Sequence, residues 1–146
     1  LVLTVRLDKL PASITNLTNL KFLNLYGQIN YLPVDLGKLS ALEGMQVGNT
    51  GLRELPESIG SLKNLTFFSA STNKISSIPE SIGGLSKINW LSLSRNQITH
   101  FPTSMSNLSG TLKELFVNGN DYSSEELKNL KKMLPNTNIT TYQPGD

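Results

Sequence analysis

The prolines of this chain recur at a nearly constant spacing, and this periodicity constrains the fold more than any other feature. Five of the seven prolines, separated by 22, 23, 23 and 23 positions, are Pro11, Pro33, Pro56, Pro79 and Pro102. Each follows an apolar residue, and two further apolar residues stand three and six positions after it. A period of about 20–50 residues indicates structural repeats, which must stack because one unit cannot bury its apolar residues alone.

A second motif, Leu-x-x-Leu-x-Leu-x-x-Asn-x-Leu, fills the other half of each unit. Its copies begin at Leu20, Leu42, Leu65, Ile88 and Leu112. The alternation of apolar and polar residues within it predicts a short strand whose leucines face inward. Stacking places these strands in one parallel sheet. The Leu-Pro segment then supplies the crossover as a 3-10 or irregular turn, because proline fixes φ.

Together the two motifs resemble the leucine-rich repeat family, and the LPxxI unit is similar to the short class found in Ras-suppressor-like and many bacterial repeat proteins. The resemblance covers nearly the whole chain. It implies an α/β repeat solenoid: a right-handed leucine-rich repeat superhelix with a concave parallel β-sheet, convex 3-10 or irregular turns and a C-terminal capping helix. We expect one domain with repeats at about 1–19, 20–41, 42–64, 65–87, 88–111 and 112–122, and a cap over 123–146.

Four polar residues stand where the chain leaves a strand and turns inward: Thr50, Asn73, Asn96 and Asn120. Backbone polar groups at such a turn lose water and have no partner in the sheet. An inward amide both donates and accepts hydrogen bonds, so the asparagines are predicted to form a structural ladder along the solenoid. The hydroxyl of Thr50 can fill only part of this role.

Two places depart from the repeat. In the second copy of the motif the expected asparagine is missing; it would stand between Gly27 and Gln28. Both this unit and the segment 1–11 are one residue short. This shortage predicts a tighter turn and a locally broken ladder, so the first two units are expected to be the least regular part of the sheet. One additional residue within 109–111 predicts a bulge on the convex side.

The C-terminal segment is predicted to be a cap. Ser123 and Glu126 have the spacing of a capping box and begin a helix that ends at Pro135. Its apolar face is formed by Leu127, Leu130 and Leu134. A last short strand over 138–142 would place Ile139 in the core.

The N-terminal segment has no such cap, because it begins in mid-strand. We expect either a fragment of a longer protein or a first strand left as an open edge. Leu1, Leu3 and Leu7 would then expose an apolar face, which predicts either self-association through this end or high mobility of the first unit. The opening three residues are too short for the core of a signal peptide. The compartment, cytoplasmic or bacterial secreted and cell-surface, stays open.

The composition excludes several kinds of site. The chain has no cysteine and one histidine, His100, so disulfides, cysteine nucleophiles and a histidine-rich metal site are not expected. A net charge of +2 is too small to indicate nucleic acid, and no apolar run is long enough to insert into a membrane. The carboxylates are scattered, and Glu80 on a convex turn is expected to affect neither folding nor binding. We expect no catalytic residue, metal, cofactor or enzyme activity within these residues.

Outward strand positions form three columns on the concave face. The first contains Phe22, Gly44, Phe67, Trp90 and Glu114; the second Val2, Asn24, Gln46, Ser69, Ser92 and Phe116; the third Thr4, Tyr26, Gly48, Ser71, Ser94 and Asn118. Phe67 and a largely exposed Trp90 should therefore lie side by side. Gly44 and Gly48 are predicted to form a trough between two aromatic ridges.

This surface predicts a non-catalytic module that binds a protein or peptide, since aromatic and small polar residues together are typical of recognition surfaces. The candidate partner-binding residues are Phe22, Asn24, Tyr26, Gln46, Phe67, Ser69, Trp90, Ser92, Arg95 and Phe116. The alternative without binding is cross-strand stacking of the rings alone. A further alternative is a bacterial surface or adhesion module that binds glycan, with Trp90 and Phe67 as platforms. The chain is also compatible with a targeting arm of an enzyme whose catalytic domain lies elsewhere.

Overall fold

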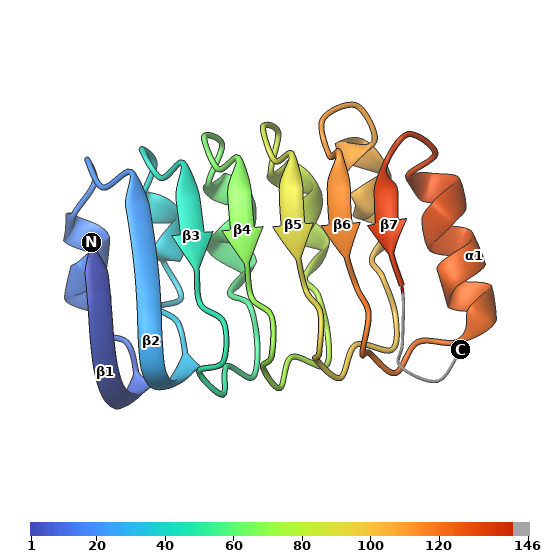
Figure 1. Ribbon diagram of the computed structural model, residues 1–146. Coiled ribbons are helices and arrows are strands. Elements are labelled where there is room, and N and C mark those ends of the chain that lie inside the picture. Colours follow the sequence, from blue (N-terminus) through green and yellow to red (C-terminus); the bar gives the residue numbers. More distant parts are fainter. Residues whose placement is uncertain (142–146) are drawn as a thin grey trace.

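The computed structural model describes residues 1–141. They form one parallel sheet, and short helices lie behind one face of this sheet (Figure 1). The strands, side by side in chain order, are β1 (Val2–Lys9), β2 (Phe22–Tyr31), β3 (Gly44–Gln46), β4 (Phe67–Ser69), β5 (Trp90–Ser92), β6 (Glu114–Phe116) and β7 (Asn138–Thr140). The 3-10 helices are η1 (Ala12–Asn16), η2 (Leu36–Lys38), η3 (Glu57–Ser61), η4 (Glu80–Gly84) and η5 (Thr103–Leu108), and α1 (Ser124–Met133) follows them. The predicted solenoid architecture is confirmed.

The core lies between the sheet and the 3-10 helices. Consecutive strands pair so that Phe68 stands opposite Leu91 and Leu91 opposite Leu115, and all three side chains are fully buried. From the other side, Ile59 and Ile82 of the 3-10 helices are fully buried in the same cluster. The predicted inward direction of the leucines is confirmed.

The predicted asparagine ladder is present. Asn96 is buried; its Oδ1 accepts from Ile75 N at 3.0 Å, and its Nδ2 donates to Ala70 O and Leu93 O, both at 3.0 Å. One side chain therefore joins two neighbouring repeats. Thr50 fills part of the role, as expected: its hydroxyl donates to Asn73 Oδ1 at 3.1 Å within the same ladder.

A left-handed residue precedes each ladder position, which the sequence did not reveal. The φ angles are 56° at Asn49, 59° at Thr72, 55° at Arg95 and 70° at Gly119. This conformation turns the chain so that the next side chain enters the core. A left-handed backbone costs a non-glycine residue about 1–2 kcal/mol. Because only one of these four residues is glycine, the residue types did not predict the left-handed conformation at these positions.

The tighter turn expected in the first two units is absent, although these units do depart most from the other repeats, with strands of 8 and 10 residues. β1 and β2 stay paired through the position of the turn, with Arg6 opposite Gln28 and Lys9 opposite Tyr31. The polar groups of these shortened units therefore pair with the neighbouring strand instead of turning inward. The asparagine ladder does stop there, and Ile29 N donates instead to Thr50 O at 2.9 Å.

The additional residue before β6 is accommodated at the end of a longer 3-10 helix. η5 has six residues, whereas η3 and η4 have five each. Gly110 follows in open space, and Figure 1 shows an enlarged loop before β6. The predicted outward bulge is confirmed.

The C-terminal cap forms with one difference from the capping box. Ser123 Oγ accepts from Glu126 N at 3.1 Å, but the Glu126 carboxylate accepts from Phe101 N at 2.7 Å and so joins the helix to the preceding repeat. Leu130 is fully buried, and Ile139 on β7 packs against the core. β7 ends at Thr140, so the predicted strand does not include Thr141, and Tyr142 lies outside the described residues.

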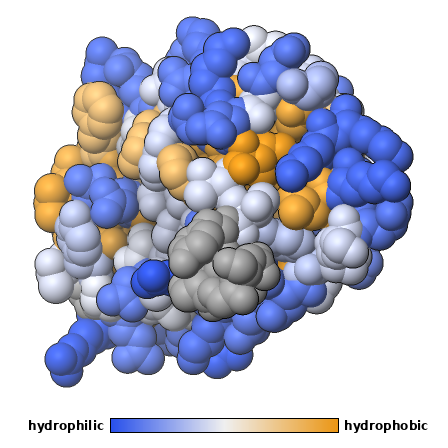
Figure 2. Space-filling model, turned by 45° about the vertical axis from the view of Figure 1, so that its right-hand side comes forward, coloured by the Kyte–Doolittle hydropathy of each residue, from blue (hydrophilic) through white to orange (hydrophobic). Residues whose placement is uncertain are grey.

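The surface on the side of α1 is mostly hydrophilic, as a cap requires (Figure 2). The exposed residues of α1 include Glu125, Lys128 and Lys131. Within residues 1–141, no helix is both long enough and apolar enough to cross a membrane.

Glycines let the 3-10 helices approach closely on the convex side. Each faces the serine 21 positions later in the next helix: Gly37 with Ser58, Gly60 with Ser81 and Gly83 with Ser104. A Cβ on Gly60 would lie 2.0 Å from the carbonyl oxygen of Ser81, closer than any real contact. The short convex spacing limits the curvature of the solenoid, because curvature follows from the small rotation between repeats.

We expect Asn96→Ala to lower the free energy of unfolding by about 1–3 kcal/mol, because it leaves buried backbone groups without partners. Asn89→Ala, an exposed position at the edge of the sheet, should cost less than half as much. Urea unfolding measures both variants. Equal midpoints would contradict the assigned register.

Gly60→Ala is expected to lower the free energy of unfolding by about 1–3 kcal/mol, since the methyl group must push two packed helices apart. The matched control is Gly110→Ala, where no heavy atom lies within 4 Å of the new Cβ. Its effect should stay within about 0.5 kcal/mol. Similar losses for both variants would show that the helices do not stack this closely.

Candidate functional site

Three aromatic side chains form a continuous strip across β4, β5 and β6. Phe67 stands opposite Trp90 in the register, and their rings stack with centroids 4.4 Å apart and planes 16° apart. Trp90 also contacts Phe116, with centroids 5.0 Å apart and planes tilted by 42°. We call Phe67, Trp90 and Phe116 the aromatic strip. The predicted neighbourhood of Phe67 and Trp90 is confirmed.

The strip faces outward because its residues alternate with core residues. Phe68, Leu91 and Leu115 are fully buried, so the side chains just before or after them point to the concave face. Phe67 remains 36% exposed. The expectation that Trp90 is largely exposed is wrong, because neighbouring rings on both sides leave it partly buried.

The predicted trough is filled at Gly44. A Cβ on Gly44 would lie 2.8 Å from Phe22 Cδ1, which shows that the Phe22 ring lies over this glycine. Without a Cβ, the β3 backbone lets the ring settle directly upon it, and Gly44 is buried. Phe22 itself stays 57% exposed, so it extends the apolar surface on the N-terminal side of the strip.

A network of serine hydroxyls forms the floor beside the strip. Ser71 Oγ bonds to Ser92 Oγ at 2.5 Å, and Ser94 Oγ donates to Asn118 Oδ1 at 2.7 Å. Ser69 and Ser92 were predicted to contact a partner, but they are only 9% and 5% exposed. The hydroxyls of Ser69 and Ser92 both bond to the hydroxyl of Ser71 between them, so they support the surface from below.

The other candidate residues lie around this floor. Asn24 and Gln46 are partly buried and stand opposite each other on β2 and β3. Tyr26 is 40% exposed on β2, and the exposed Arg95 follows β5 with its side chain against Gly119. They border the strip as separate polar groups.

Sequence reasoning missed one polar pair at the C-terminal end of the first column. Asn138 Nδ2 donates to Glu114 Oε2 at 2.8 Å. These residues stand opposite each other on β7 and β6. The sequence could have predicted this pair, because the predicted last strand adds Asn138 to the column that contains Glu114.

Ionisable groups elsewhere have local partners. The His100 Nδ1 lies 2.9 Å from the hydroxyl of Thr99, and residues 1–141 contain no group of three histidine, aspartate or glutamate side chains able to hold a metal ion. The pKa of the Asp35 carboxyl is lowered mainly by the hydrogen bond from Lys38. Hydrogen bonds from Ser104 lower the pKa of Glu80, whose Oε2 accepts from Ser104 N at 3.1 Å. Glu80 therefore links two repeats through an exposed hydrogen bond.

Comparison with known proteins identifies the family. No family model matches the sequence, and no curated protein matches it. The solved structure of the leucine-rich repeat protein LIC12759 from Leptospira interrogans is 34% identical and covers 94% of this chain, with a TM-score of 0.87. The chain belongs to the leucine-rich repeat proteins.

Other structures share this leucine-rich repeat fold. An internalin from Listeria monocytogenes is 27% identical over 87% of the chain, with a TM-score of 0.69. The plant peptide hormone receptor RGFR1, solved in complex with RGF2, is 26% identical over 92% of the chain, with a TM-score of 0.68. The chain spans 36%, 42% and 26% of the lengths of these three proteins. The leucine-rich repeat neighbours support a general protein-binding repeat module.

Proposed function

We propose that this leucine-rich repeat chain binds an extended protein or peptide segment across the aromatic strip and acts without catalysis. The observation that carries the proposal is the contact of three rings on three adjacent strands, on a face otherwise lined by small polar side chains. A contiguous apolar patch on a protein surface commonly marks an interaction site. Central aromatic residues surrounded by polar groups are typical of binding hot spots.

The geometry favours a protein or peptide over a glycan. Trp90 is held between Phe67 and Phe116, so the indole offers an edge to a ligand. Sugar rings stack on an open aromatic face, which this arrangement does not supply at Trp90. The peptide hormone receptor RGFR1 adds support, since its fold matches this chain and its structure contains RGF2. A targeting arm of a larger enzyme would use the same surface.

Trp90→Ala should fold normally and weaken binding by about 2 kcal/mol or more, roughly thirtyfold in Kd. The variant loses two aromatic contacts, with Phe67 and with Phe116, and each costs about 0.5–1.5 kcal/mol of stability beyond its buried area. Peptides selected from a displayed library on the wild-type chain provide the ligand, and calorimetry measures the affinity.

Phe67→Ala should behave like Trp90→Ala, and Thr103→Ala on η5 is the convex control. A glycan array tested in parallel separates the two ligand classes. If Trp90→Ala folds and binds normally, the partner uses another face. If it unfolds, the assignment of inner and outer positions is wrong.

We also propose that the N-terminal end of the isolated chain associates with a second copy. Leu1, Leu7 and Leu17 are 45%, 40% and 46% exposed at this end. A depression of about 290 Å³ among leucines, with Leu3 and Ile14 in its lining, adds to this apolar surface. Association would cover both the apolar surface and the free edge of β1.

Light scattering of the chain is expected to show a mass that rises with concentration. Leu7→Lys should return the chain to a monomer, because a charge at the centre of the contact is costly to bury. Thr103→Lys, on η5, is the control and should leave association unchanged. A monomer at all concentrations, with slow amide exchange through residues 1–10, would contradict the proposal.

A further inference from the structure

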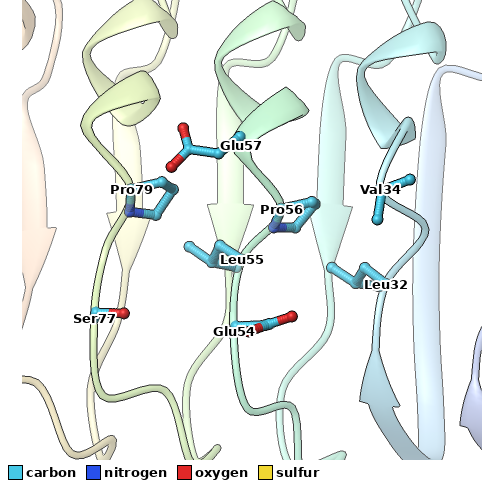
Figure 3. A pocket seen from close by; sticks show the side chains of 8 residues that line it. All are labelled: Leu32, Val34, Glu54, Leu55, Pro56, Glu57, Ser77 and Pro79. Atoms are coloured by element: carbon cyan, nitrogen blue, oxygen red, sulfur yellow. The ribbon is translucent and has the colours of Figure 1, made fainter.

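A second hollow lies on the flank that leads from the strands into the 3-10 helices, away from the aromatic strip. Its volume is about 400 Å³, and Leu32, Leu55, Pro56 and Pro79 form its apolar part (Figure 3). We call this hollow the flank pocket. The Leu-Pro pairs of consecutive repeats create it, because they stack side by side along the solenoid. A neighbouring depression of about 650 Å³ shares Leu32, Val34 and Glu54 with it and continues toward Pro11.

An exposed valine stands at the border of both hollows. Val34 is 85% exposed, more than any other large apolar residue in the described chain. The equivalent position after the proline carries Glu57 and Glu80 in the next two repeats. Burial of apolar surface is favourable by about 25 cal/mol per Å², so a partner that covers Val34 gains free energy.

Two carboxylates in the flank pocket have no partner among the described residues 1–141. Figure 3 shows Glu57 and Glu54 on opposite sides of Leu55 and Pro56. Among residues 1–141, no hydrogen bond or ion pair engages either carboxylate, and neither lysine nor arginine lines this pocket. Several other acidic side chains do have partners: Glu43, for instance, lies 3.0 Å from Lys21 Nζ.

We propose that the flank pocket binds an arginine side chain of a peptide segment that also carries leucine or a similar aliphatic residue. The apolar stem of the arginine packs on Leu55 and Pro56, and its guanidinium pairs with one of the two carboxylates, Glu54 or Glu57, that flank these residues (Figure 3). A guanidinium suits this place because its planar fork of donors can bind a carboxylate through two parallel hydrogen bonds, while its stem covers apolar surface. The neighbouring aliphatic residue of the peptide covers Val34. This site is independent of the aromatic strip.

Titration of the ¹⁵N-labelled chain with two pentapeptides tests the proposal. The probes are Ac-Gly-Leu-Arg-Leu-Gly-NH₂ and the same peptide with glutamate in place of arginine. The arginine peptide should shift the amide signals of residues 32–34 and 54–57 and bind at least tenfold more tightly than the glutamate peptide. Its affinity should fall in 1 M salt, where the screening length is only about 3 Å.

The variant Glu54→Gln with Glu57→Gln should bind the arginine peptide about fivefold more weakly or worse, because neither position then offers a carboxylate to the guanidinium. Glu125→Gln on α1 is the control for one lost negative charge and should bind like the wild type. Trp90→Ala should also leave this binding unchanged, which separates it from the proposed function of the concave face. Shifts at other residues, equal binding of both peptides, or unchanged binding by the double variant would each overturn the proposal.

Discussion

The inward turn held by the ladder side chains is the interaction on which the rest of the structure depends. Each strand must end within a few residues and send its chain back under the next unit, which leaves backbone groups away from water. Asn96 meets this need by bonding at once to its own repeat and to the one before it. Where the ladder residue is missing, in β2, the chain does not turn, and the strand extends to ten residues. The ladder thus sets the length of the strands as well as their spacing.

The recognition surface follows from this registration of the repeats. Because each unit stacks on the next without slippage, residues one repeat apart stand opposite each other on adjacent strands. Phe67 and Trp90 stack for this reason, and Phe116 joins them from the next strand. The glycines of the convex side add a second condition, since they allow the 3-10 helices to approach closely and limit the curvature.

The two candidate surfaces differ in the physics of recognition. The aromatic strip offers rigid rings that are already packed against each other, so little conformational entropy is lost when a partner binds them. The flank pocket combines a hollow between Leu-Pro pairs with two carboxylates that have no partner among the described residues. The two surfaces share no residue, because the pocket lies on the segment that leads from the strands to the 3-10 helices.

The sequence alone determined the repeat length, the inward leucines, the ladder positions and the columns of the concave face, because periodicity and alternation are local properties of the chain. The tertiary structure decided how far each side chain is covered. Only the packed repeats show Phe22 lying over Gly44, and Trp90 partly buried between two rings. The local sequence pattern also did not predict the long pairing of β1 with β2, because this pairing depends on the backbone groups of the neighbouring strand. The burial of a side chain depends on neighbours one repeat away, and the residue types alone do not determine the rotamers and spacing of those neighbours.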